Sequence, residues 1–255
     1  MKIILILFLS LIINPNVFAK CGSNGISCLN KKINLDKNGL IILEFYKISQ
    51  TLIKDLNQKY PVYLQSNFGK VSLQVVEVLK GEMSITQVVL KPVKPLKIDQ
   101  YYLFKIDNLP QYEHLPKSYN QKSKTSFPLT FKAVQSKNVK APVFKVEPFF
   151  LKESLTEYGC GPEELVHFNV KTANEIDLFV RTTVKNKKTG KTTTFILAIE
   201  NEIVKVGHGM CAGAFYFANG KSFEASFQLL DLTGKLSIIS KPIAFSITKD
   251  ITVRF

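Results

Sequence analysis

The chain has 255 residues, and 34 lysines and arginines against 20 acidic residues give a formal net charge of +14. Beyond the N-terminus no apolar run approaches the roughly 20 residues of a membrane-spanning helix, so we expect no such span in the processed chain. The charge would attract anionic polymers. However, Arg181 and Arg254 are the only arginines, which favours a lysine-rich composition over dedicated phosphate recognition.

Residues 1–19 have the pattern of a cleaved signal peptide. Lys2 precedes an apolar core that is too short to span a bilayer, and the segment ends in Val17-Phe18-Ala19. We expect cleavage after Ala19 and an exported protein that is periplasmic, on the cell surface or secreted. Lipidation of Cys21 is not favoured, because Phe18-Ala19-Lys20 lacks the small residues that usually precede such a cysteine.

Residues 20–38 form a cysteine-bearing lead to the first domain. Four cysteines in an oxidising compartment allow three connectivities. Proximity favours a Cys21–Cys28 bond, which leaves Cys160 to pair with Cys211. No second cysteine or histidine lies at a zinc-site spacing from any of them, so we expect no metal site.

The first half of the chain has the pattern of short strands. Apolar, often β-branched runs separated by turn sequences predict antiparallel strands. These runs cover residues 40–45, 60–64, 71–78, 84–90 and 127–134. Between the first two runs, apolar residues at helical spacing predict one or two helical turns.

The stretch from Leu96 to Ile106 carries a fold signal. Leu96 lies six residues ahead of Tyr102, which starts an inward row continued by Phe104 and Ile106. This spacing resembles the tyrosine corner of immunoglobulin-like and fibronectin type III-like sandwiches, in particular the bacterial Ig-like domains of exported proteins. The resemblance covers about a dozen residues and implies a structural role for Tyr102, whose hydroxyl would tie a loop back to its strand.

Two polar stretches follow. Residues 108–126 contain Tyr112, His114 and Tyr119 among prolines and lysines, which predicts a long surface loop able to contact a partner. Residues 136–142 end at Pro142 and predict a linker.

The second half repeats the strand pattern. Predicted strands cover residues 143–146, 149–151, 164–170, 176–184, 192–199, 203–206, 213–218, 223–230, 245–247 and 251–255. Asp231 to Ser237 is similar to the aspartate-and-glycine hairpin near the end of many bacterial Ig-like domains. We therefore predict an all-β fold of two antiparallel Ig-like β-sandwich domains in tandem, residues 39–135 and 143–255, the second stapled by Cys160–Cys211.

The glycine-rich stretch around His208 is the best candidate for chemistry. His208 lies between Gly207 and Gly209, and Glu163 or Glu164 could orient it if the disulfide joins the two loops. A hydrolase also needs a nucleophile, and no Gly-x-Ser-x-Gly elbow occurs. No helix follows the glycines to receive a phosphate, and we expect no cofactor.

We therefore expect a non-catalytic exported module that binds an envelope protein or a glycan. The contact surface would be the 108–126 loop and the Cys160/Cys211 end, with Tyr112, His114, Tyr119, Glu163, Glu164 and His208 as binding residues. A basic binder of anionic envelope polymers and a hydrolase built on His208 are the alternatives. An exported location argues against nucleic acid as the partner.

Overall fold

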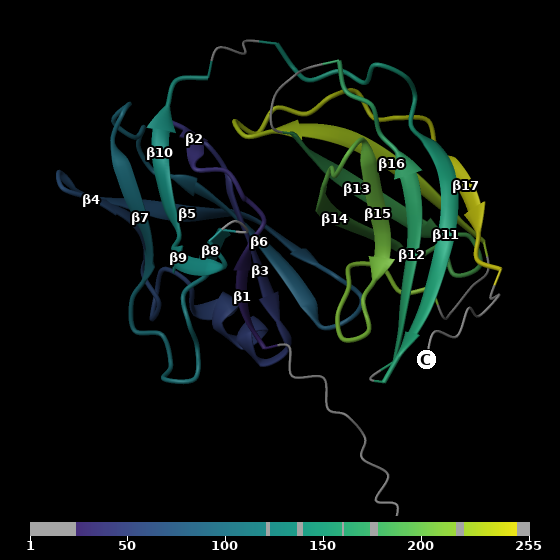
Figure 1. Ribbon diagram of the computed structural model, residues 1–255, viewed down its shortest axis with the longest axis horizontal. Coiled ribbons are helices and arrows are strands. Elements are labelled where there is room, and N and C mark those ends of the chain that lie inside the picture. Colours follow the sequence, from purple (N-terminus) through teal and green to yellow (C-terminus); the bar gives the residue numbers. More distant parts are fainter. Residues whose placement is uncertain are drawn as a thin grey trace, which may run out of the picture.

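The computed structural model describes residues 24–120, 123–136, 140–159, 161–173, 178–217 and 222–248. Its ribbon consists of strands in two layered halves, the first built from residues up to 134 and the second from 149 onward (Figure 1). Over the described ranges, no helix has the length and apolar character needed to cross a membrane. Cys21, Cys160, the 1–19 leader and the expected strand at 251–255 lie outside the described residues.

The first half contains ten strands and one 3-10 helix within the described ranges. The helix η1, Lys47–Asp55, occupies the place where helical turns were predicted. The strands are β1 Gly25–Cys28, β2 Asn34–Asp36, β3 Ile41–Tyr46, β4 Val62–Ser66, β5 Gly69–Lys80, β6 Ile85–Pro92, β7 Tyr101–Ile106, β8 Lys117–Asn120, β9 Thr125–Pro128 and β10 Thr130–Val134.

One continuous sheet forms the sandwich of the first half. Among the described residues its order is β1-β3-β6-β5-β4-β7-β10-β2. The twelve-residue strand β5 pairs with β6 along one part and with β4 along the other, and its register shifts at a bulge between Val75 and Glu77. A bulge bends its strand, so β5 carries the sheet from one layer into the other.

The second half is a sandwich of separate sheets in the part of the chain that the structure covers. A three-stranded sheet has the order β11-β12-β15 and a four-stranded sheet the order β14-β13-β16-β17. The strands are β11 Phe149–Tyr158, β12 Gly161–Asn169, β13 Leu178–Asn186, β14 Thr192–Ala198, β15 Ile203–His208, β16 Ser222–Asp231 and β17 Ile243–Ser246.

The two halves share one strand order. Taken in chain sequence, β1, β3 and β6 correspond to β11, β12 and β15, while β5, β4, β7 and β10 correspond to β14, β13, β16 and β17. Seven strands in two facing layers are typical of Ig-like sandwiches. The first half differs in its added strand β2, which runs parallel to β10, and in the continuity of β5.

Tyr102 makes the contact that a tyrosine corner requires. It lies on β7, it is buried, and its hydroxyl accepts a hydrogen bond from the backbone N–H of Lys97 at 2.9 Å. Leu96 is also buried beside it in the first core.

Strands β3 and β6 have both faces buried. Ile41, Leu43 and Phe45 of β3 point into the core of the first half, whereas Ile42 belongs to a second core formed with residues of the second half. In β6, Val88 and Val89 divide in the same way. Adjacent apolar residues, Ile41 to Leu43 in β3 and Val88 to Leu90 in β6, thus reflect burial on two sides, as in covered sheets.

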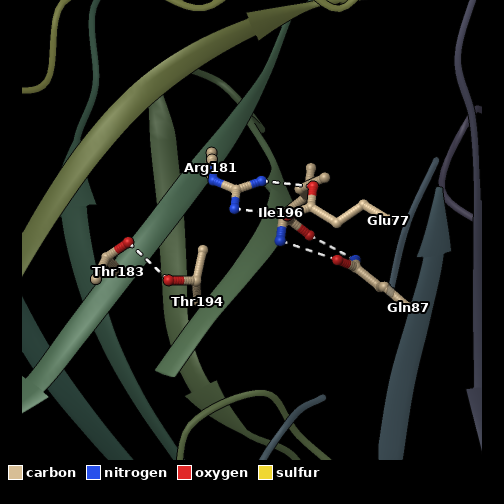
Figure 2. Close-up of polar contacts among 6 residues, drawn as sticks. All are labelled: Glu77, Gln87, Arg181, Thr183, Thr194 and Ile196. Carbon is tan, nitrogen blue, oxygen red and sulfur yellow. Dashed lines mark hydrogen bonds and ion pairs between the residues drawn. The ribbon is translucent and has the colours of Figure 1, made fainter. Parts of the chain in front are cut away.

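Gln87 joins the two halves through hydrogen bonds. It is fully buried on β6, its Nε2 donates to the Ile196 carbonyl at 2.7 Å, and its Oε1 accepts from the Ile196 N–H at 2.9 Å (Figure 2). In the described part of the chain β14 is an edge strand. The amide therefore replaces a neighbouring strand, and its second N–H donates to Glu44 Oε1 at 3.1 Å.

A charged pair lies beside this contact. Arg181 donates two hydrogen bonds of 2.7 Å to the two carboxylate oxygens of Glu77 (Figure 2). Paired bonds of this geometry fix orientation as well as adding energy. The sandwiches are consequently joined by a shared apolar core and by two bidentate polar contacts.

The predicted strand at 213–218 is not formed. Among its described residues only Gly213 forms isolated bridges, with Met83 and His208. The backbone of Gly213 and Ala214 bonds instead to the turn at Glu82 and Met83 between β5 and β6. The segment instead serves the contact between the halves.

We expect Gln87→Ala to destabilise the protein by about 3 kcal/mol in urea unfolding. The substitution leaves the N–H and carbonyl of Ile196 buried without partners, and each such group costs about 1–3 kcal/mol. Gln74→Ala, on the exposed surface of β5, is the matched control and should change stability by less than about 0.5 kcal/mol. Equal effects of the two substitutions would contradict the role given to Gln87.

Candidate functional site

His208 and Glu164 form a buried pair. They lie opposite each other on the neighbouring strands β15 and β12. The His208 Nε2 and Glu164 Oε2 atoms are 3.6 Å apart, and His208 is only 2% exposed. That distance is longer than a hydrogen bond, so the contact is an ion pair when the imidazole is protonated. On the other side of the ring, Nδ1 lies 3.0 Å from the Gly209 carbonyl.

The pKa of His208 is raised above its ordinary value of 6.5. Burial is the largest influence and opposes protonation. The nearby Glu164 carboxylate, the Gly209 carbonyl and the negative charge of Glu163 together outweigh the effect of burial. The folded protein therefore holds a proton on His208 more tightly than a free imidazole does.

Two glycines permit this close packing. Gly207 has a φ of +148°, and a Cβ there would lie 2.0 Å from the Glu164 carbonyl oxygen. A Cβ on Gly213 would lie 2.1 Å from the His208 Cβ. The glycine-rich sequence thus allows β15 and the following loop to approach their neighbours, and it does not form a phosphate-binding loop.

A second histidine has a serine partner. On the adjacent strands β12 and β11, His167 Nε2 lies 3.0 Å from Ser154 Oγ. Burial and the charges of Lys152 and Lys205 lower the pKa of His167. The charged residues that act on the His167 ring are therefore both lysines. A catalytic serine–histidine pair instead requires a carboxylate next to the imidazole.

Neither histidine has the surroundings of a catalytic or metal site. Glu164 lies against the His208 ring, whose other contacts among the described residues are the Gly209 carbonyl and the Tyr216 ring, and no described hydroxyl or thiol is hydrogen-bonded to it as a nucleophile would be. Within the ranges described, no three or more His, Cys, Asp or Glu side chains are grouped to hold a metal ion. The arrangement pins β15 to β12, which is a structural task.

The predicted loop residues belong to the first half, whereas this pair belongs to the second. Tyr112, His114 and Tyr119 are all exposed, and Tyr119 belongs to a small hairpin of β8 and β9 within the predicted loop. Glu113 anchors the loop, because its buried carboxylate accepts a hydrogen bond of 2.5 Å from Ser49 Oγ on η1. The six predicted binding residues therefore divide between the loop and the β12–β15 end of the second half.

A cavity of about 340 Å³ opens beside Tyr216. It lies between the β5–β6 turn and the β13–β14 hairpin, and Glu82 is its acidic group. Glu82 accepts hydrogen bonds from Thr193 and from the Tyr216 N–H, and its carboxylate lies 3.6 Å from Lys191 Nζ. The Glu82 carboxylate thus links the first half to Thr193, Tyr216 and Lys191 of the second half.

The expected Cys21–Cys28 bond is wrong. Cys28 is a free thiol on β1, and its sulfur donates to Asn30 Oδ1 at 3.8 Å. The residue keeps some exposed surface, but burial of the thiol raises its pKa to about 12. Cys211 is disulfide-bonded, while Cys160 lies outside the described residues, so the Cys160–Cys211 pairing remains a prediction.

An exposed apolar edge was missed by the sequence reasoning. In the described part of the three-stranded sheet, β11 is an edge strand. Its first residues, Phe149, Phe150 and Leu151, are exposed, and a bulge follows between Phe150 and Lys152. From Lys152 to Tyr158 the pairing with β12 is regular.

Comparison with protein-family models gives no match, and neither does comparison with curated proteins. Solved structures match at low similarity. A pullulanase from Anoxybacillus sp. LM18-11 in complex with maltotriose is 9% identical over 82% of this chain and 24% of its own, with a TM-score of 0.25. The type I pullulanase of Bacillus subtilis str. 168 is 9% identical over 87% and 25%, with a TM-score of 0.24.

The tandem Ig repeats of Dlar are 12% identical over 91% of this chain and 100% of that chain, with a TM-score of 0.24. The chain spans about a quarter of the length of the pullulanases. At these scores the similarities support no conclusion about ligands or activity, and the Ig-like fold rests on the strand order.

We expect the His208–Glu164 pair to make stability fall as the pH rises above 6.5. The pKa of His208 is higher in the folded state than in the unfolded state. The resulting stabilisation is therefore complete below the unfolded-state pKa and is lost as the pH rises through the folded-state pKa. The urea midpoint should therefore decrease on the alkaline side of 6.5, and Glu164→Gln should remove most of this slope. An unchanged slope in Glu164→Gln would contradict the ion pair.

His167→Gln is the matched control for that experiment. The lowered pKa of His167 affects stability only below 6.5, where the folded state resists protonation. Its substitution should leave the alkaline slope intact.

Cys28 should react slowly in the native protein. With a pKa of about 12 the thiol carries almost no thiolate near neutral pH. Iodoacetamide should therefore label the Cys28 peptide after unfolding in urea and only weakly before it, as measured by mass spectrometry without reductant. If the Cys28 peptide stays unlabelled in urea, Cys28 is in a disulfide and the free thiol described above is contradicted.

Proposed function

We propose that this chain is an exported, non-catalytic binding module that contacts a protein partner through the β11 edge of its second sandwich. The observation that carries the proposal is the exposure of Phe149, Phe150 and Leu151 at the start of an edge strand. Soluble proteins usually shield long edge strands, because unpaired backbone groups attract other strands.

The rest of β11 suits the addition of a partner strand. The stretch from Lys152 to Tyr158 pairs regularly with β12 on one side, and among the described residues no strand pairs with its other side. A peptide strand would take its affinity from the backbone groups on that side and its specificity from the apolar residues beyond the bulge. Near the middle, the Glu153 carboxylate accepts a hydrogen bond of 3.0 Å from the Thr248 N–H.

The other functions have weaker support. An anionic-polymer binder would gather its lysines on one face, yet Lys70, Lys132 and Lys187 pair with carboxylates in both halves. A hydrolase would need a nucleophile beside His208. Glycan binding at the 108–126 loop is favoured only by the exposure of Tyr112 and Tyr119.

A photo-crosslinking amino acid at Leu151 tests the proposed contact in envelope extract of the source cell. We expect a discrete cross-linked protein, and we expect its yield to fall at least about fivefold when Phe149→Ser is added, since apolar anchors dominate binding energy. The same probe at Phe68, which is exposed on the first half, should not capture this protein.

Capture of the same proteins from both positions would overturn the proposal. So would cross-links from Leu151 that join only residues of the same chain, because the chain's own C-terminal residues would then cover the edge.

A further inference from the structure

The connection between β16 and β17 is held by two buried serines. The N–H groups of Ser237 and Ser240 donate to the carbonyls of Leu229 and Phe227 at 2.9 and 2.8 Å. Their hydroxyls accept from the N–H groups of the same two residues at 2.9 and 3.0 Å. Each serine therefore pairs with β16 as a strand residue would, although no regular strand forms there.

The residues between the serines are forced outward. Ile238 is 86% exposed and Ile239 is 54% exposed, and neighbouring Leu236 is also exposed. We call Leu236, Ile238 and Ile239 the isoleucine tip. Three exposed apolar side chains within four residues form a patch, and exposed apolar patches mark interaction sites.

Lysines flank this tip in sequence. Lys235 and Lys241 stand on either side of it, and residues 232–248 contain no aspartate or glutamate. The Lys241 N–H donates to the Glu147 carboxylate at 3.4 Å. This contact places the segment that ends at Glu147 beside the tip. That segment repeats the pattern, with exposed Val143 and Val146 on either side of Lys145. Glu147 is the acidic residue that this contact places at the patch.

We propose that the isoleucine tip inserts into the interface of an anionic lipid bilayer while the flanking lysines contact the headgroups. Exposed aliphatic side chains next to cations in sequence match a surface with negative headgroups above an apolar layer. A fluid bilayer requires no complementary pocket, which suits a side chain that protrudes almost completely. The proposal uses residues other than those of β11, so either can fail without the other.

Vesicle co-sedimentation tests the proposal with the purified protein. We expect binding to vesicles of phosphatidylglycerol and phosphatidylcholine, little binding to phosphatidylcholine alone, and weakening as salt rises from about 0.05 M to about 0.5 M. The double variant Ile238→Ser/Ile239→Ser should lower the partition coefficient by about tenfold or more, from the loss of two apolar side chains. Ile48→Ser, at an exposed isoleucine on η1, is the matched control.

A fluorescent reporter separates insertion from adsorption. The chain has no tryptophan, so Ile238→Trp introduces a single probe at the tip. Its emission should shift to shorter wavelength when anionic vesicles are added, whereas Ile48→Trp should not shift. Urea unfolding of every variant checks that the fold is retained.

Absence of binding by the unmodified protein to anionic vesicles would overturn the proposal. Full binding by the double serine variant would also overturn it, because lysines alone would then account for attraction. Capture of an acidic protein by the tip, without any vesicle binding, would assign the surface to a protein partner and reject the lipid.

Discussion

The arrangement of the two halves depends on one side chain that pairs with the backbone of an edge strand. Gln87 gives the backbone of Ile196 the donor and acceptor that a further strand would supply. An unpaired buried amide is costly, so the pairing persists only while β6 and β14 remain in register. The shared apolar core and the Arg181–Glu77 pair hold that register. The surfaces of the two halves consequently keep a fixed relation.

The sequence predicts the strands because their causes are local. Alternation in 71–78 and turn residues between runs locate most strands, and the Leu96–Tyr102 spacing identifies a corner whose hydrogen bond spans five residues. Contact between the halves has a local trace only in the short runs of adjacent apolar residues in β3 and β6. Those runs indicate that both faces are covered, but the covering residues lie more than a hundred positions away.

Site residues were predictable to the extent that strand pairing controls them. Glu164 and His208 meet because β12 and β15 are neighbours, whereas the residues that pack on this pair from other elements do not follow from strand pairing. Cys21–Cys28 failed because spacing does not report where a thiol points. Apolar residues in strand-like sequence predict burial. The exposure of the first residues of β11 and of the isoleucine tip therefore could not be predicted from the sequence. Their exposure follows from a bulge and from two serines that act through tertiary contacts.

The dependence of β14 on Gln87 also affects the order in which the chain can mature. Synthesis delivers the N-terminal half first, and domains generally fold as units in that order. When β14 emerges, β6 can already present the amide that covers it. The first half can therefore cover an edge of its neighbour that would otherwise be open to pairing with other chains.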